Sequence, residues 1–178
     1  MFGDYTDIFR TIGILSTPVI NRDDESIFLV CFEVDDGAPD GVSHRLYKIS
    51  LQTGEDLAGP TTITGSVAGS GPDEGPPGLV TFKSFYQTQR ASLTLQDDIL
   101  YFGFGSRADV QPYHGWVFAY ATTSSSAITP LLQLGIYCTS PNSLGGGVWQ
   151  SGAAALADAT GTYWVSGGSP HVAAWLCW

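Results

Sequence analysis

Three segments of the chain share one pattern of hydrophobic and polar positions. Each begins with a short apolar stretch, continues through a polar turn that contains Asp, and ends in a stronger stretch of β-branched or aromatic residues; the segments are residues 17–30, 91–104 and 152–165. Short apolar stretches on either side of turn-forming residues are typical of paired antiparallel strands, and Asp both tolerates turn geometry and caps it. The pattern therefore predicts three β-hairpins.

Further strands are expected after the first two hairpins. Residues 44–50 alternate apolar with polar positions and residues 115–120 are almost fully apolar, so each stretch predicts a third strand. A turn and an edge-like fourth strand come next, at 61–64 and at 128–134. Pro130 suits an edge because proline cannot donate a hydrogen bond to a central ladder.

The recurrence of four antiparallel strands indicates the fold class, since it is the plan of a β-propeller. We expect an all-β fold in which residues 1–178 form a single incomplete propeller domain. Four-stranded blades are expected near 13–64 and 77–135, with part of a third near 147–168. The chain is accordingly expected to be an internal or truncated piece of a larger ring.

The spacing between the hairpins, about 60 to 75 residues, is longer than the roughly 40–45 of compact propeller repeats. Long loops at 65–78 and 137–147 account for the difference. A β-sandwich is the main alternative, because eight to ten short strands would also fill one. The recurring four-strand module favours the propeller.

Charge and composition limit the partners. The net charge is −10, and no Lys or Arg follows Arg107, so nucleic acid and anionic lipid are not expected partners. No window reaches the roughly 20 apolar residues of a membrane span, and the N-terminus has no signal-peptide pattern. The chain is expected to be soluble, with its compartment unassigned. Beyond Arg107 only Asp109 and Asp158 are charged, which predicts that this part is covered in a larger assembly.

Cysteine and histidine spacing does not predict a metal site. Cys31, Cys138 and Cys177 are odd in number and far apart, which favours buried free thiols. The three histidines lack a local ligand pattern, so no metal is expected. His44 and His114, near the starts of third strands, are expected to make fixed hydrogen bonds between blades.

Two groups of residues are candidates for ligand binding. Tyr113, His114, Trp116, Trp149 and Gln150 could stack on and hydrogen-bond a flat polar ligand, although packing between blades would use the same residues. Arg90 could bind a carboxylate or another anion, or pair with an acid of a neighbouring blade.

Two other motifs do not support chemistry. Ser151 is not part of a Gly-x-Ser-x-Gly elbow, so serine hydrolysis is not expected. Residues 35–41 lack the downstream glutamate of a calcium loop and are expected to form a solvated hairpin tip.

A family resemblance covers roughly residues 12–168. It is carried by five motifs: Gly13-Ile-Leu-Ser-Thr-Pro-Val-Ile20, His44-Arg-Leu-Tyr-Lys-Ile-Ser-Leu-Gln-Thr-Gly54, Gln89-Arg90, Pro112-Tyr-His-Gly-Trp-Val117 and Gly145-Gly-Gly-Val-Trp-Gln-Ser-Gly152. These resemble the quinoprotein-type, or PQQ-like, β-propeller repeat proteins. Full-length members of that family are often secreted or periplasmic.

The resemblance implies two functions. Many members have lost the cofactor and act as binding or assembly scaffolds, so a non-catalytic binding or scaffolding propeller fragment is expected, with no cofactor. Its expected partners are further blades, a second copy or another protein, and a small polar ligand. The alternative is a fragment of a quinone-dependent oxidoreductase, which would hold PQQ and calcium; the residues that bind them in such enzymes are not matched in this sequence.

Overall fold

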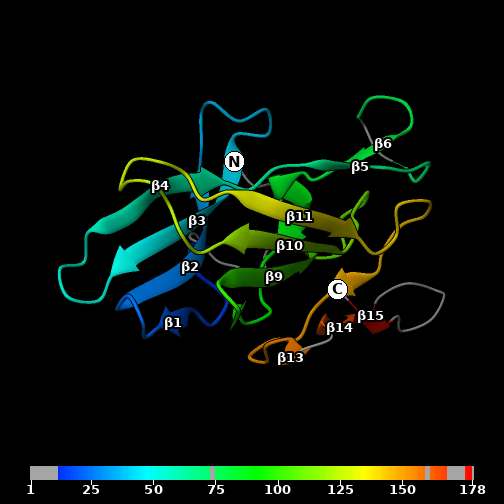
Figure 1. Cartoon of the computed structure of the whole chain (residues 1–178). Helices are drawn as coiled ribbons and strands as arrows, with labels where there is room; N and C mark the ends of the chain where they lie inside the picture. Colours follow the sequence, from blue (N-terminus) through cyan, green and yellow to red (C-terminus); the bar gives the residue numbers. More distant parts are fainter. Residues whose placement is uncertain (1–11, 73–74, 159–160, 168–174, 178) are drawn as a thin grey trace.

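The computed structural model describes residues 12–72, 75–158, 161–167 and 175–177, and almost every regular element in them is a β-strand (Figure 1). The strands pair antiparallel within each sheet. One turn of 3-10 helix, η1 (Ser84–Tyr86), is the helical element of the described residues. The expectation of an all-β, antiparallel fold is confirmed.

Three larger sheets follow one another along the chain. The first sheet contains, in spatial order, β1 (Val19–Asn21), β2 (Ser26–Val34), β3 (Val42–Ser50) and β4 (Asp56–Thr62). The middle sheet has the order β11 (Gln133–Cys138), β10 (Trp116–Ala121), β9 (Ile99–Ser106) and β7 (Gln87–Thr88), and β8 (Thr94–Gln96) also pairs with β9. The last sheet has the order β12 (Gly147–Val148), β14 (Gly161–Gly167) and β13 (Leu156–Asp158), with β15 (Trp175–Cys177) also paired to β14. A small hairpin of β5 (Ser66–Ala68) and β6 (Leu79–Thr81) lies between the first and middle sheets in the chain.

The three predicted hairpins form. They are β1–β2, β8–β9 and β13–β14, and each is closed at or beside the predicted turn. In the second turn Asp97 and Asp98 both have positive φ, of 49° and 61°, which matches the twist that a two-residue hairpin connection requires. Part of the third turn, residues 159–160, lies outside the described residues.

The fourth strands differ from the prediction. β4 begins at Asp56 instead of residue 61, because Ala58 pairs with Lys48 and is buried. β11 begins at Gln133, because the chain near Pro130 turns away and bonds to β4, with the Gly59 amide donating to the Thr129 carbonyl. The pattern of single residues could not show this contact between sheets.

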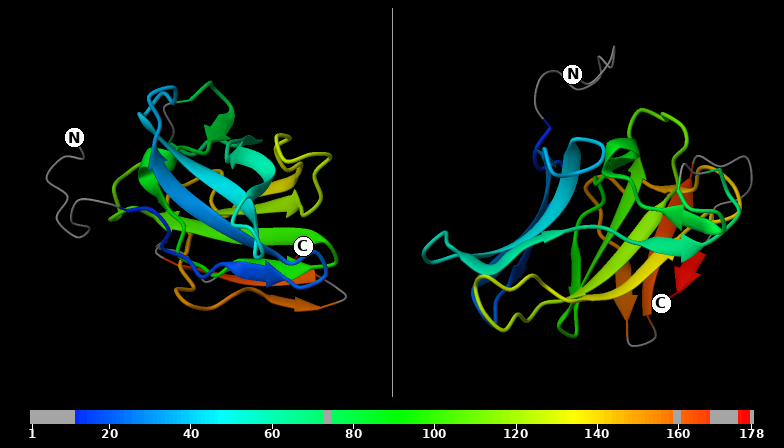
Figure 2. Two further views of the ribbon diagram at one scale, coloured as in Figure 1. Left: turned by 90° about the vertical axis from the view of Figure 1, so that its left-hand side faces the viewer. Right: turned by 90° about the horizontal axis from the view of Figure 1, so that it is seen from above.

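The sheets stack in three layers, and the middle sheet is covered on both faces (Figure 2). Its first face carries Phe102, Phe104 and Phe118, which form one core with Phe28 and Leu46 of the first sheet. Its second face forms a smaller core with the last sheet, made of Ala91, Val117, Val148, Ala155 and Trp164. This explains why β10 is buried at five of its six positions.

In each of the three sheets, two short stretches of chain stand where a blade would have one continuous first strand. β9 pairs with both β7 and β8, β14 pairs with both β12 and β13, and β2 pairs with β1 and, through Phe32, with Gly13. We call residues 13–21, 87–96 and 147–158 the inner segments. They lie side by side, since the Leu93 amide donates to the Thr17 carbonyl and the Ser92 amide donates to the Ala153 carbonyl.

Candidate functional site

A groove opens at one end of the first sheet. Its walls are the β2–β3 loop, the chain between β4 and β5, and the stretch from β6 into η1; it is lined by Asp35, Gly37, Ala38, Pro39, Asp40, Val42, Ser43, Thr62, Ile63, Thr64, Gly65, Thr81, Phe82, Lys83 and Ser84. Its volume is about 730 Å³, within the range of small-molecule sites. The groove is therefore large enough for a ligand of ordinary metabolite size.

The lining of the groove combines hydroxyl groups and charges with an apolar floor. Ile63 and Phe82 are almost fully buried beneath it, while Thr62 and Thr64 are exposed. Asp35 is held by Arg45, whose Nη2 lies 2.9 Å from Oδ2. The hydrogen bond from Arg45, followed by bonds from Ser43 and the Gly37 amide, lowers the pKa of Asp35. The groove therefore presents a fixed carboxylate beside several hydroxyls.

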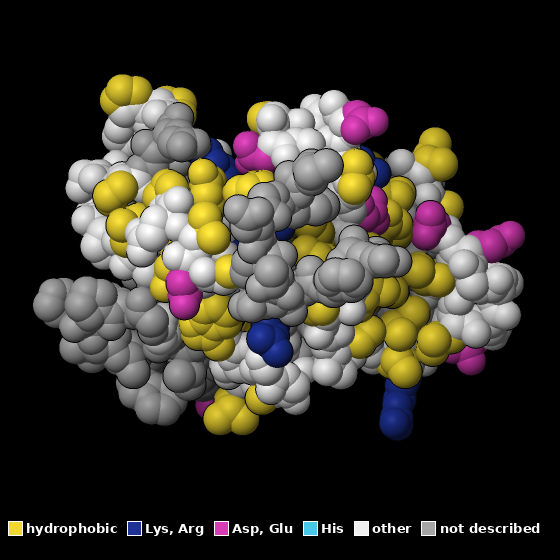
Figure 3. Space-filling model, turned by 180° about the vertical axis from the view of Figure 1, so that it is seen from behind, with side chains coloured by type: hydrophobic (Ala, Val, Ile, Leu, Met, Phe, Trp, Pro, Cys, Tyr) yellow, Lys and Arg dark blue, Asp and Glu magenta, His cyan; other side chains and the backbone are white. Residues whose placement is uncertain are grey.

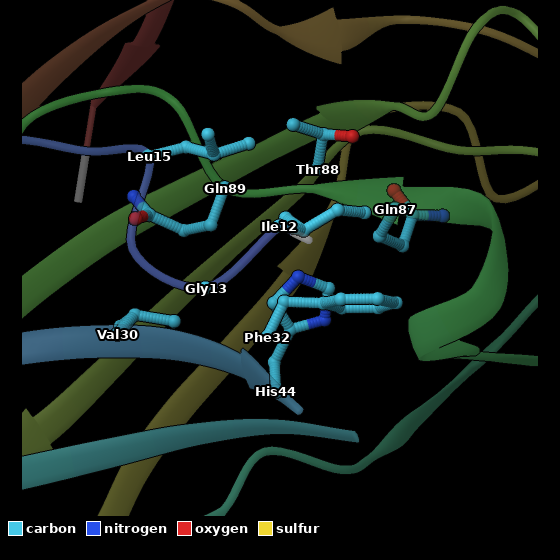
Figure 4. A pocket seen from close by; sticks show the side chains of 9 residues that line it. All are labelled: Ile12, Gly13, Leu15, Val30, Phe32, His44, Gln87, Thr88 and Gln89. Carbon is cyan, nitrogen blue, oxygen red and sulfur yellow. The ribbon is translucent and has the colours of Figure 1, made fainter. Parts of the chain in front are cut away.

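A second, much smaller pocket lies where the inner segments of the first and middle sheets meet (Figure 4). It is lined by Ile12, Gly13, Leu15, Val30, Phe32, His44, Gln87, Thr88 and Gln89, and its volume is about 10 Å³. This is about the size of one water molecule. Figure 4 shows Phe32 and His44 on one side of the pocket and the Gln87–Gln89 chain on another.

Two buried polar atoms at this pocket lack partners among the described residues. These are Nδ1 of His44 and Oε1 of Gln89. Burial, followed by repulsion from Arg107, lowers the pKa of His44 to about 3, so the imidazole is neutral. His44 is held mainly by ring contacts, with centroids 4.8 Å from Phe32 and 5.0 Å from Phe104. The expected fixed side-chain hydrogen bond of His44 is not seen in the described residues.

The predicted aromatic candidates do not form one platform. Trp116 is fully buried and belongs to the core between the first and middle sheets. Trp149 lies over the opposite face of the middle sheet, where its ring would be 2.7 Å from a Cβ placed on Gly105. The two indoles are therefore separated by the middle sheet.

Tyr113 and His114 are buried in the chain that leads into β10. His114 places Nδ1 3.0 Å from the carbonyl of Ser140 and Nε2 3.2 Å from the carbonyl of Pro72. The expected hydrogen bonds of His114 are present, but their partners lie in loops, and the expectation that they hold one blade to another stays a prediction. Burial raises the pKa of Tyr113, and the neighbouring charge of Asp109 adds to the effect. His114 therefore joins the chain before β10 to two other loops.

Arg90 and Gln150 lie on neighbouring inner segments, because the next residues along the chain, Ala91 and Ser151, form an antiparallel bridge. Arg90 is exposed, and no described acid forms an ion pair with it. Gln150 is partly buried. Of the six candidates, Arg90 is the one whose side chain is free to meet a ligand in solvent.

Metal-binding groups are not clustered in the described part of the chain. No three His, Cys, Asp or Glu side chains there could hold a metal ion together. Cys138 is buried and Cys31 half-buried, and neither forms a disulfide among the described residues; His171 and the side chain of Cys177 lie outside the described residues. The same part contains no helix with the length and hydrophobicity of a membrane span.

Sequence reasoning missed the groove. Residues 35–41 do form a hairpin loop, as predicted, but the loop also walls the groove, together with Lys83 and Thr64 from distant segments. No local pattern links these stretches. The one signal in the sequence was the long Gly- and Pro-rich loop at 65–78, because loops of this length within a domain are often functional.

The fold and the groove place the chain in a broad class: all-β proteins of stacked antiparallel sheets, here with a ligand-sized groove at one end of a sheet. Comparisons of the chain with protein-family models, with curated proteins and with solved structures find no match.

Proposed function

We propose that this chain is a non-catalytic binding or scaffolding module built from β-propeller-type blades, similar to PQQ-like repeat proteins, and that its groove takes a small polar ligand. The groove itself carries the proposal. Its volume is about 730 Å³, Ile63 and Phe82 form its apolar floor, and hydroxyls and charges surround it. Small-molecule sites combine these two properties, since apolar surface supplies affinity and a few polar groups fix orientation.

The blade assignment is supported by the repeated plan of the sheets. Each has an interrupted first strand followed by a hairpin, and the inner segments of successive sheets are joined by hydrogen bonds. In a propeller, blades pack face to face around an axis and ligands meet the loops at the blade ends. The groove is formed by such loops.

The test is a nuclear magnetic resonance titration of the ¹⁵N-labelled chain with free amino acids and, separately, with monosaccharides. The proposal predicts saturable shifts for at least one probe class, concentrated in the amides of residues 35–43, 62–65 and 81–84. Thr64→Arg, at an exposed position of the lining, should weaken binding by at least about tenfold. Thr53→Arg, in an exposed turn outside the groove, is the matched control and should bind normally.

Two outcomes would overturn the proposal. One is the absence of saturable shifts with either probe class, or binding that Thr64→Arg leaves unchanged. The other is saturable binding of PQQ in the presence of calcium, monitored by intrinsic tryptophan fluorescence. That result would favour the quinone-dependent oxidoreductase instead.

A further inference from the structure

Hydrophobic side chains come to the surface in several patches (Figure 3). One set belongs to the first sheet, on the face turned away from the middle sheet. We call it the outer face; it consists of Ile20, Ile27, Leu29, Cys31, Tyr47 and Ile49. Ile20 is 51% exposed, and the other five are half-buried. No described segment covers this face, and its composition suits a second sheet better than water.

Strand register shows which positions in the other sheets correspond to the outer face. Each hairpin has a last pair of residues before its turn, and the second member of that pair is Ser26, Ile99 or Gly161. The residue that follows it on the second strand is Ile27, Leu100 or Thr162, respectively. Two residues further along the same face come Leu29, Phe102 and Trp164, which therefore occupy one position of the repeat. On the third strand, pairing with Leu29 and Phe102 makes Tyr47 the counterpart of Phe118.

The counterparts are covered completely. Phe102, Phe118 and Trp164 are each 0% exposed, because the preceding sheet packs against the face that carries them. The residues of the preceding sheet that cover them also occupy equivalent strand positions in both cases. They include Phe28 and Val30 in the first sheet and their counterparts Tyr101 and Gly103 in the middle sheet.

The same packing therefore occurs twice. In each case, one sheet packs against the face of the sheet that follows it in the chain. The outer face is the side of the first sheet that corresponds to these covered faces, and no sheet among the described residues packs against it. We propose that it docks the last sheet of a second copy of this chain, in a head-to-tail contact that continues the stack. Such a contact is heterologous, so it builds either a closed ring or an open fibre.

Glu33 and Arg45 lie on the same side of the sheet as the outer face, at its end next to Cys31, and they are paired with each other. Arg45 pairs with Asp35 at 2.9 Å and with Glu33 at 3.7 Å, and the hydroxyl of Tyr47 donates to Glu33. Docking would therefore not bury an unpaired cation, which would be the costly case. The inference goes beyond the proposed ligand binding and holds even if the groove binds nothing.

The test measures association of the purified chain by sedimentation velocity over a wide range of concentration. The wild type is expected to associate more as concentration rises, and Ile20→Lys should raise the dissociation constant by at least about tenfold, since it places a charge within an apolar contact. Ile128→Lys is the matched control. Ile128 is 87% exposed in the β10–β11 connection, so its replacement should leave association unchanged.

Alkylation of Cys31, followed by mass spectrometry of its peptide, gives a second readout on the outer face. Cys31 should become protected as concentration rises in the wild type and in Ile128→Lys, but not in Ile20→Lys. Unchanged far-ultraviolet circular dichroism would show that all three chains are folded. A wild type that stays monomeric, or loss of association in Ile128→Lys equal to that in Ile20→Lys, would overturn the proposal.

Discussion

At the scale of single residues, His44 links burial to the pH dependence of stability. Its folded-state pKa of about 3 lies below the ordinary value of 6.5, so between these values the unfolded chain binds a proton that the folded chain does not. The contribution of His44 to stability is therefore lost as the pH falls from about 6.5 toward 3, by about 1.4 kcal/mol per pH unit.

The variant His44→Phe isolates this effect, because it keeps a ring beside Phe32 and Phe104 but cannot take up a proton. We expect the unfolding free energy of the wild type, relative to the variant, to decrease as the pH is lowered from neutral. Urea unfolding at several pH values measures it. A difference that does not change with pH would contradict the assigned burial of a neutral imidazole.

A second residue-scale prediction concerns Gly103, which lies where the middle and last sheets touch. A Cβ at this position would be 2.6 Å from Cγ1 of Val148 and 3.2 Å from the Trp164 ring. Gly103→Ala should therefore destabilise the fold by about 1–3 kcal/mol through overpacking. Gly167→Ala is the control, since its Cβ would meet the Trp149 ring at 3.9 Å and should be nearly neutral.

Thermal or urea unfolding measures the effect of Gly103→Ala. The clash also predicts that Val148→Ala, combined with Gly103→Ala, costs less than the sum of the two single changes, because the smaller side chain makes room for the new methyl group. Strict additivity would show that the two positions do not touch.

At the scale of elements, the β8–β9 hairpin stores backbone strain in its turn. Asp97 and Asp98 both adopt positive φ, which glycine reaches at lower cost than aspartate. Asp98→Gly is expected to raise the free energy of unfolding, because Asp-Gly is a favoured pair in a hairpin turn with two positive φ values, and Asp98→Ala should lower it. The carbonyl of residue 98 would still accept hydrogen bonds from Thr122. Urea unfolding of the three chains is the measurement, and a loss of stability in Asp98→Gly would contradict it.

Elements with a strong local pattern could be predicted from the sequence. The hairpins and the third strands have clear alternation and turn residues, and they form where expected. β4 and β11 were misplaced because Gly59 and the chain before Leu131 are fixed by contact between two sheets. Two-residue strands such as β7 and β12 are too short to give any period.

At the scale of the whole molecule, stacking decided what the sequence could reveal of the site. Trp116 and Trp149 were grouped because both are amphipathic aromatics, yet they lie on opposite faces of the middle sheet. The groove was missed for the converse reason, since it joins residues near 35, 62 and 83 that share no motif. Residue type shows which side chains can bind, but the order in which sheets stack decides which of them meet.

The double coverage of the middle sheet has a consequence for how the chain unfolds. Each large sheet is built from a nearly continuous stretch of sequence, so most of its pairing is local and can form early. The middle sheet, however, shares one hydrophobic core with each neighbour. Detaching either neighbour exposes one of the two apolar faces of the middle sheet, so stability is coupled from layer to layer as in a one-dimensional array. The three sheets are therefore separable in sequence but cooperative in free energy.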